Sequence, residues 1–294
     1  MNMIHDASQL FAGNGAPAGR SIGAILIDTG RLTPADAERI LRLQREQGMM
    51  FGDAAKTLGI LSEADIQFAL SQQFDYPYLQ SGQSSVATEV VAAYQPFSLK
   101  VEALRALRSQ LMLRWFDVAH ERKTLAIVSP DRREGRSWLA SNLAVVFSQL
   151  GERTLLIDAD LRNPSQHTLF GIENRTGLST LLSGRSSPDA LQRIPELLGL
   201  SVLPAGSTPP NPQELLARPL LPQLLTQFGE QFDVIILDTP PGSEYADGQT
   251  LSARAGAALM VARRDQTGSR NLRAYADSLR HGGCTVIGSI LNNQ

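Results

Sequence analysis

The feature that most constrains the fold of this chain is a regular alternation in its C-terminal two thirds. Short apolar runs are separated there by segments long enough to form helices. The runs are 124–129, 153–158, 201–206, 233–238, 257–262 and 285–291. Apolar strands that alternate with helices predict an α/β fold, with a doubly wound, mostly parallel sheet covered by helices on both faces. Ligands of such sheets bind at the carboxyl ends of the strands.

One of these strand ends runs into a loop suited to phosphate. Residues 129–137 read SPDRREGRS and lead into the helical segment WLASNLAVVFSQLG. A loop between a strand and a helix directs backbone N–H groups at a phosphate, and a terminal hydroxyl can bind Mg²⁺. Gly135 and Ser137 fit these roles. Arg136 stands where a lysine is usual and Pro130 where the simple motif has glycine, so the loop alone is a weak match.

Two further strand ends carry carboxylates. Asp158 and Asp160 lie two residues apart at the end of one run, so in an extended end both point the same way, toward a metal or an attacking hydroxyl. Asp238 ends another apolar run. A single aspartate of this kind is usually a turn residue or a helix cap. The three strand ends together, in this order, favour a nucleotide site over a generic α/β fold.

Composition excludes several classes of function. The net charge is −2, which gives no long-range field toward nucleic acid or anionic lipid. The single cysteine, Cys284, excludes a disulfide framework and a cysteine-rich zinc site. The sequence has neither a signal peptide nor an apolar run of about 18 residues. We therefore expect a cytoplasmic protein without direct membrane insertion, which a partner could hold at the inner face of the inner membrane.

The N-terminal part divides into a leader and a repeat. Residues 1–19 are rich in Gly, Ala and Asn without periodicity and predict a disordered leader. Residues 20–80 contain two copies of one pattern, in which a short apolar helix stops at Gly30 or Gly59. Thr33 or Ser62 then opens a second helix. This predicts a small helical module.

Between the two parts, residues 81–97 are rich in Ser and Ala and end near a proline, which predicts an interdomain linker. The P-loop domain is expected over residues 98–294. Its first helix, from Leu99 to Trp115, carries an apolar stripe. The stripe consists of Val101, Leu104, Leu107 and Leu111.

The repeat resembles the N-terminal domain of type II secretion and pilus assembly ATPases, whose tandem motif binds cyclic di-GMP in some members. The arginine that opens each family motif is Ser21 in the first copy and Met50 in the second, and Arg20 lies one position early. Without those charged contacts we expect no useful affinity for cyclic di-GMP. A helical module that docks a protein partner is favoured, and a ligand-binding module remains the alternative.

The second part, over about residues 95–293, resembles the bacterial tyrosine autokinases of capsule and exopolysaccharide export, the BY-kinases. The phosphate loop, LLIDADLR and IILDTPP are similar to their Walker A, A′ and B motifs. The sequence EGRS and the repeat resemble the EpsG-like chain-length-determinant group. The resemblance implies ATP or ADP and Mg²⁺ as cofactors. It implies as nucleotide-binding residues Arg133, Glu134, Gly135, Arg136, Ser137, Trp138 and Asn292.

The same resemblance assigns roles at the site. Ser137, Asp160 and Asp238 would hold the metal, and Asp158 would be the base for a tyrosine hydroxyl, so the catalytic group is Asp158, Asp160 and Arg136. Glu102, Arg105 and Arg108 match a family pattern, with steps of three, that is associated with assembly between subunits. Such a spacing keeps them on one helix face. An ordinary solvated face is the alternative, and a homo-oligomer is expected.

These features predict an ATP-binding tyrosine-kinase-like protein that regulates exopolysaccharide chain length or export with a membrane partner. Two departures predict weak or absent autophosphorylation. Arg136 cannot be placed like a compact ammonium, and none of the five tyrosines (Tyr76, Tyr78, Tyr94, Tyr245 and Tyr275) lies in a C-terminal tail. The alternatives are a catalytically weak, nucleotide-switched scaffold and a partitioning-type ATPase, which would have a lysine at Asp131.

Overall fold

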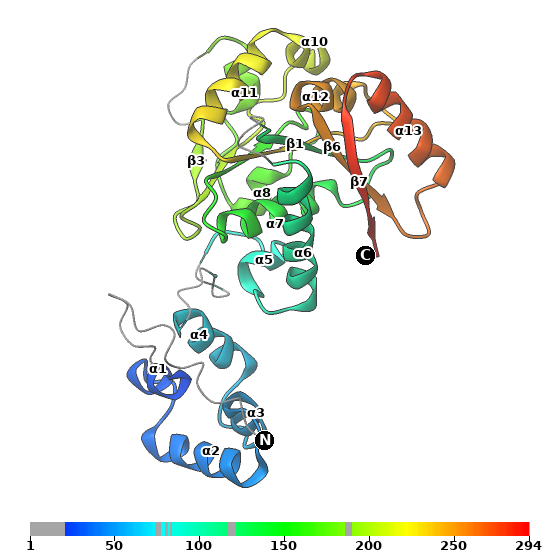
Figure 1. Cartoon of the computed structure of the whole chain (residues 1–294). Helices are drawn as coiled ribbons and strands as arrows, with labels where there is room; N and C mark the ends of the chain where they lie inside the picture. The colour runs from blue at the N-terminus through cyan, green and yellow to red at the C-terminus, as the bar shows by residue number, and fades with distance from the viewer. Residues whose placement is uncertain are drawn as a thin grey trace. The chain divides into compact units, whose positions relative to one another are not determined.

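The computed structural model describes residues 21–73, 78–79, 82, 84–116, 122–185 and 190–293. The chain divides into two compact units, residues 1–76 and 77–294, which are described separately (Figure 1). The predicted leader, residues 1–19, lies outside the described residues. Among the described residues, no helix has both the length and the apolar character needed to cross a membrane.

The first unit consists of two helix pairs. Its helices are α1 (Ile22–Asp28), α2 (Pro34–Gln47), α3 (Phe51–Thr57) and α4 (Glu63–Gln73). Gly30 and Gly59 follow the first helix of each pair with φ of +69° and +66°, the left-handed conformation that glycine adopts at least cost. Thr33 and Ser62 open the second helices, and their hydroxyls accept hydrogen bonds from backbone N–H groups three residues on. The predicted repeat and its caps are confirmed.

The second unit is built on one sheet. Its strands are β1 (Thr124–Val128), β2 (Thr154–Asp158), β3 (Gln192–Arg193), β4 (Leu200–Leu203), β5 (Val234–Asp238), β6 (Ala257–Arg263) and β7 (Thr285–Asn292). Their order is β3-β4-β2-β5-β1-β6-β7. All described pairings are parallel except that of β3 with β4. The six predicted strands are confirmed, and the two-residue β3 is an addition.

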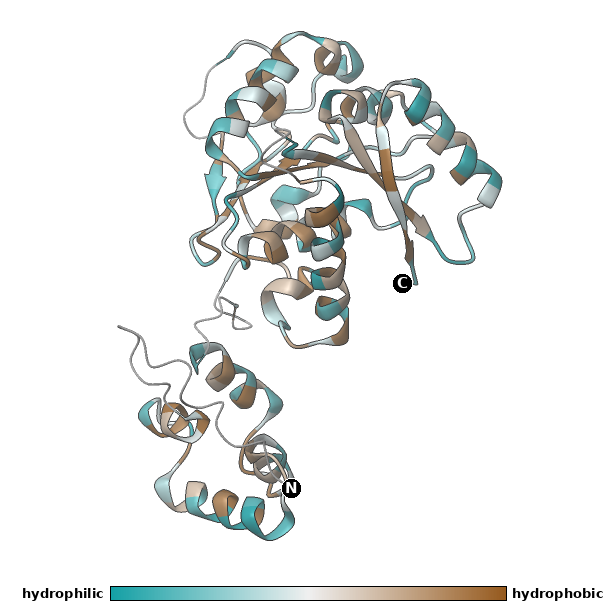
Figure 2. Cartoon of the chain, viewed as in Figure 1, coloured by the Kyte–Doolittle hydropathy of each residue, from teal (hydrophilic) through white to brown (hydrophobic). Residues whose placement is uncertain are grey.

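Helices cover both faces of this sheet. They are α5 (Val91–Tyr94), α6 (Leu99–Arg114), α7 (Arg136–Ser148), α8 (Gln166–Phe170), α9 (Leu178–Leu182), α10 (Pro212–Ala217), α11 (Leu220–Gln231), α12 (Asp247–Ala255) and α13 (Ser269–His281). Side chains from α5 to α8 share one apolar core with the sheet, and side chains from α9 to α13 share the other. The central strands are hydrophobic along most of their length, whereas β3 and much of α13 are hydrophilic (Figure 2). The predicted fold class is confirmed.

The segment predicted to be a linker is part of the second unit. Within this segment, several side chains enter the core of the second unit, and Val90, Ala92 and Ala93 are fully buried. The Asn142 amide oxygen accepts a hydrogen bond from the Ala92 N–H (2.8 Å), and the Gln149 amide donates to the Ala92 carbonyl (3.0 Å). The linker interpretation is wrong here, because small Ala and Ser side chains allow close packing on α7 as readily as they allow flexibility.

Candidate functional site

The phosphate loop joins β1 to α7. Gly135 ends the loop with φ of +99° at the N-cap of α7. A Cβ atom at this position would collide with the amide of Asn292, which donates a hydrogen bond to the Glu134 carbonyl (3.0 Å). Asn292 lies at the end of β7, so the last strand braces the loop. Ser137 follows in the first turn of α7, and the open N–H groups at this helix start suit an anion.

Of the residues predicted to contact nucleotide, Glu134 holds the loop together through its side chain and Arg133 through its backbone carbonyl. Glu134 is 2% exposed, and its carboxylate accepts hydrogen bonds from the Asp131 N–H (2.8 Å) and the Thr267 hydroxyl. Arg133 has φ of +59°, and its carbonyl accepts a hydrogen bond from Arg263 (3.1 Å). Both residues therefore shape the loop through contacts within the protein, Glu134 by its carboxylate and Arg133 by its carbonyl.

Arg136 points into the protein. It is 8% exposed, and its guanidinium donates to the carbonyls of Thr239 (2.9 Å) and Asp131 (2.6 Å) and to the Ser129 hydroxyl. These contacts tie the phosphate loop to the segment after β5. The rigid fork of a guanidinium suits several acceptors at once, as the single nitrogen of lysine does not. The charge of Arg136 lies inside the loop rather than on its outer surface.

The predicted aspartates come together at the carboxyl ends of neighbouring strands. Asp158 and Asp238 are direct partners in the β2–β5 register. Asp158 is fully buried, and its carboxylate accepts hydrogen bonds from the N–H groups of Asp160 (3.3 Å), Ser165 (2.9 Å) and Gln166 (2.9 Å). Burial, and then the Asp238 charge, raise its pKa well above the usual value, although the backbone donors oppose that shift. In this geometry Asp158 faces its own chain and not an open site.

Asp160 and Asp238 differ in how much of their carboxylate is occupied. The Asp160 Oδ1 accepts from the N–H groups of Arg162 (3.1 Å) and Asn163 (2.9 Å). Asp238 is fully buried, and its Oδ2 accepts from the Gln166 amide (2.7 Å). Burial raises the pKa of Asp238 to about 6, against hydrogen bonding from Gln166 and Ser137. No described residue makes a geometrically sound hydrogen bond to its Oδ1.

These residues fit a magnesium ion that arrives with nucleotide. Among the described residues, no group of three or more His, Cys, Asp or Glu side chains could hold a metal. Mg²⁺ keeps several waters and is usually bound through one or two carboxylates and substrate phosphates. The unpaired Oδ1 of Asp238, close to the Ser137 hydroxyl, is an oxygen donor set of this kind. The chain could hold the ion only together with phosphate.

Two arginines clamp the segment that follows β5. Arg132 of the phosphate loop binds Glu244 through two hydrogen bonds, and Arg162 pairs with the buried Asp247 (2.8 Å). The Arg162 guanidinium also lies over the Tyr245 ring, 4.0 Å from its centroid. Sequence reasoning did not assign a role to these contacts, because they join residues more than 80 positions apart.

Tyr275 of α13 packs against the segment that follows β5. It is 6% exposed, and burial raises the pKa of its hydroxyl. Its ring leaves no room for a Cβ atom at Gly242, and its hydroxyl leaves none at Gly248. Both positions therefore need glycine as long as Tyr275 is present.

A pocket of about 400 Å³ adjoins the loop. Its walls come from α6, α7 and the ends of β6 and β7, and they include Trp138, Asn292 and Leu107 next to Gly135. The lining is mainly apolar, as is usual for a site that receives a flat organic ring. Two of the predicted nucleotide-binding residues, Trp138 and Asn292, are thus brought to one cavity beside the phosphate loop.

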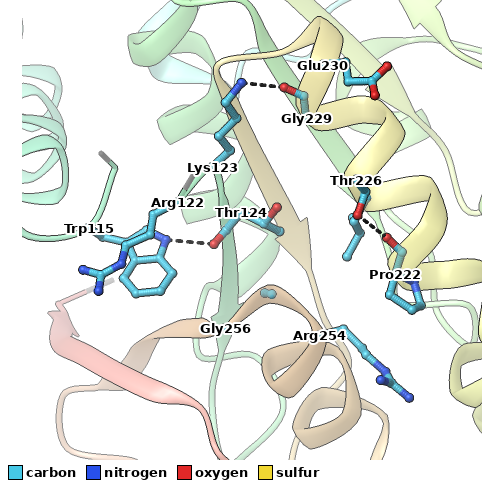
Figure 3. A pocket seen from close by; sticks show the side chains of 12 residues that line it. Trp115, Arg122, Lys123, Thr124, Pro222, Thr226, Gly229, Glu230, Arg254 and Gly256 are labelled. Carbon is cyan, nitrogen blue, oxygen red and sulfur yellow. Dashed lines mark hydrogen bonds between the residues drawn. The ribbon is translucent and has the colours of Figure 1, made fainter. Parts of the chain in front are cut away.

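A pocket of about 600 Å³ lies at the opposite edge of the sheet, where β1 and β6 begin (Figure 3). Trp115 donates to the Thr124 carbonyl (2.9 Å), and Lys123 donates to the Gly229 carbonyl (2.5 Å). None of the predicted site residues lines it. It is therefore separate from the phosphate loop.

The three residues of the predicted subunit interface lie along α6 but differ in their surroundings. Glu102 is exposed and pairs with Arg105 (3.2 Å). Arg108 reaches across to α7 and donates to the Val146 carbonyl (2.7 Å). Arg108 thus supports the fold of its own chain, whereas Glu102 is the most exposed of the three.

The strand–loop–helix unit, with aspartates at the ends of the two adjacent strands, defines a P-loop NTPase domain. A family model of ParA type, described as a NUBPL iron-transfer P-loop NTPase, matches residues 121–292, more than half of the chain. The chain is 35% identical over 211 residues to the tyrosine-protein kinase YwqD of Bacillus subtilis, which covers 72% of this chain and 88% of that protein. It belongs to the bacterial tyrosine-kinase family, the BY-kinases.

Solved structures agree with this assignment. The kinase domain of the Escherichia coli tyrosine kinase ETK aligns with a TM-score of 0.68 and 32% identity, over 73% of this chain and 83% of that domain. Other relatives are far longer. The chain spans 28% of the tyrosine-protein kinase ptk of Acinetobacter johnsonii, with 35% identity over 69% of this chain, and 35% of a Klebsiella pneumoniae relative.

Proposed function

We propose that this chain binds ATP and ADP together with Mg²⁺ and acts as a tyrosine-kinase-type regulator of exopolysaccharide chain length or export. The observation that carries the nucleotide site is Asp238. It ends β5 beside the phosphate loop with one carboxylate oxygen unpaired, next to Ser137 at the start of α7. Membership of the BY-kinase family supports the wider role.

Each part of the site has a task in this proposal. Backbone N–H groups of the loop before α7 bind the phosphates, and Ser137 and Asp238 hold the cation. When bound, Mg²⁺ neutralises negative charge on the phosphates. Trp138 and Asn292 would border the base in the pocket beside Gly135. Asp160 lies at the same edge, with Oδ1 already taken by backbone donors.

Tyrosine phosphorylation by the isolated chain is proposed to be weak. Arg136 donates its hydrogen bonds to the loop and to the segment after β5. The proposed base Asp158 is fully buried with three backbone donors on its oxygens. Tyr94 and Tyr275 are buried in the cores. The internal contacts of Arg136 favour, as a second candidate, a scaffold that uses nucleotide as a conformational switch.

The setting is proposed from the family. A membrane-bound chain-length or export protein would be the partner, and the chain would act in the cytoplasm at the inner membrane through it. Self-association would use the face of α6 that carries Glu102 and Arg105. The first unit would dock a protein rather than cyclic di-GMP.

Calorimetric titration with ADP, with and without Mg²⁺, tests the nucleotide site. Asp238→Ala deletes a proposed cation ligand. It should reduce the Mg²⁺-dependent gain in ADP affinity by about tenfold or more while the fold survives. Asp233→Ala is a matched control, because Asp233 precedes the same strand and pairs with Arg153 instead (2.6 Å). Equal affinity of wild type and Asp238→Ala would show that the site is misassigned. Incubation with labelled ATP then separates phosphoprotein from released phosphate.

A further inference from the structure

Gln166 touches all three strand-end motifs. It is the first residue of α8 and is fully buried. Its amide nitrogen donates to Asp238 Oδ2 (2.7 Å) and to the Ser137 carbonyl (3.2 Å). Its backbone N–H donates to Asp158 Oδ2 (2.9 Å). One side chain thus connects the phosphate loop with the ends of β2 and β5.

The direction of this amide is fixed by its partners. The Ser137 carbonyl can only accept a hydrogen bond, and Asp238 Oδ2 accepts one as a carboxylate, so the Gln166 NH₂ group must face both. The amide oxygen Oε1 is then turned the other way. It is buried, and no described residue donates a hydrogen bond to it.

Two acceptor atoms therefore lack donors in the same small region: Gln166 Oε1 and Asp238 Oδ1. Buried polar atoms are nearly always paired, so such a cluster calls for a missing donor. The Ser137 hydroxyl has one proton and cannot serve both. Phosphate oxygens of a bound nucleotide are acceptors as well and would not help. Water held by a cation supplies O–H donors, and Mg²⁺ keeps several of its waters in protein sites.

We propose that Gln166 is a positioning residue for the magnesium ion of this site, a role that rests on the proposed nucleotide function. Its amide nitrogen holds Asp238 by Oδ2, which leaves Oδ1 directed at the cation or its water. Its Oε1 accepts a hydrogen bond from a water ligand of the ion. Gln166 touches neither the phosphates nor the cation directly.

This role predicts different effects on cation binding and on phosphate binding. Loss of a hydrogen bond that orients a metal-binding side chain commonly lowers metal affinity by about 10- to 100-fold. The backbone N–H groups that would bind phosphate do not depend on the Gln166 amide. Loss of that amide should weaken the gain from Mg²⁺ far more than the binding of metal-free nucleotide.

The test is ADP binding by the full chain, measured calorimetrically with Mg²⁺ and with EDTA. In Gln166→Met, which has similar length and no hydrogen-bonding amide, the Mg²⁺-dependent gain should fall about tenfold or more, and metal-free affinity should stay within about threefold. Gln192→Met is the matched control. Its amide also donates to a main-chain carbonyl, that of Glu173 (2.8 Å), but on strand β3. It should retain the wild-type gain.

A second readout follows the metal itself. With ADP present, Mn²⁺ binding measured by electron paramagnetic resonance should weaken by a similar factor in Gln166→Met. If that variant does not fold, Gln166→Asn keeps an amide but is one methylene too short to reach both partners, and the same losses are expected.

The outcomes separate the two proposals. An unchanged Mg²⁺ gain in the Gln166 variants, with wild type binding normally, overturns the positioning role alone. Equal loss of affinity with and without metal also overturns it, because this would mark general damage to the loop. A wild type that binds no ADP, or binds it without any effect of Mg²⁺, overturns the proposed nucleotide site and the role of Gln166 with it.

Discussion

Hydrogen-bond partners lie at very different sequence separations in two regions of the molecule, the helical module and the carboxyl ends of the strands. In the module, Thr33 and Ser62 accept from N–H groups three residues on. At the sheet edge, Arg136 reaches Thr239, and Glu134 reaches Thr267, 103 and 133 positions away. A change at one of these caps therefore removes local contacts, whereas a change of Arg136 or Glu134 removes contacts between distant loops.

The largest effect that this comparison predicts is at Arg136. Arg136→Met removes the donor of two buried acceptors, the Thr239 carbonyl and the Ser129 hydroxyl. Each costs about 1 to 3 kcal/mol when left unpaired, so the free energy of unfolding should fall by about 4 kcal/mol. Arg39→Met in α2 is the control, since Arg39 forms an exposed ion pair with Asp36. That change should stay within about 0.5 kcal/mol. Urea unfolding measures both, and equal losses would break the comparison.

The second effect depends on pH. The pKa of Asp238 is about 6 in the folded chain, above its ordinary value of 3.8, because the carboxylate is buried. An acid whose pKa is raised by folding binds its proton more tightly in the folded state, so its contribution to stability falls as pH rises from about 4 to 6. At pH 8 the ionised, buried group should cost about 3 kcal/mol.

Asp238→Asn should therefore be more stable than wild type at pH 8 by about that amount and nearly equal to it at about pH 3. Denaturant unfolding at the two pH values measures the difference. A stability difference that does not change with pH would mean that Asp238 titrates normally. The control is Asp233→Asn, whose pKa is lowered by Arg153, so that it should lose stability at pH 8 instead.

A smaller effect is expected in the module. Ser62→Ala and Thr33→Ala each remove one helix cap and should lower the free energy of unfolding of the first unit by about 1 kcal/mol. The two losses should be similar, because the caps are equivalent in the repeat. Thermal unfolding followed at both units would detect them. A loss of several kcal/mol in either variant would show that the caps support more than their own helices.

The smallest effect on stability is expected on α6. Glu102→Lys breaks the ion pair with Arg105 from its exposed side, so stability should change by less than about 1 kcal/mol, while light scattering should report a lower mass if this face joins subunits. Arg108→Glu should instead destabilise the chain through loss of the bond to Val146. A wild type that remains monomeric at high concentration with nucleotide would end the interface proposal.

Sequence patterns predicted most of what depends on near neighbours or on strand periodicity. The six apolar strands, the repeat and its caps followed from residues a few positions apart. The order of the strand ends also predicted that Asp158, Asp238 and the phosphate loop would meet. The inward turn of Arg136 and the position of Gln166 could not be predicted, because both depend on partners brought close only by the assembled sheet. Residues 84–97 were misread because small residues suit tight packing and linkers alike.

The packing of Tyr275 against Gly242 and Gly248 constrains the order in which these three residues can be substituted in evolution. Alanine at either glycine would collide with the phenol ring or its hydroxyl, so such a substitution becomes tolerable only after a smaller side chain has replaced Tyr275. Replacing Tyr275 first leaves a cavity in the core shared by α9 to α13, which lowers stability but avoids the collision. The three positions form one epistatic set, and descendants can leave it by the route that begins on α13.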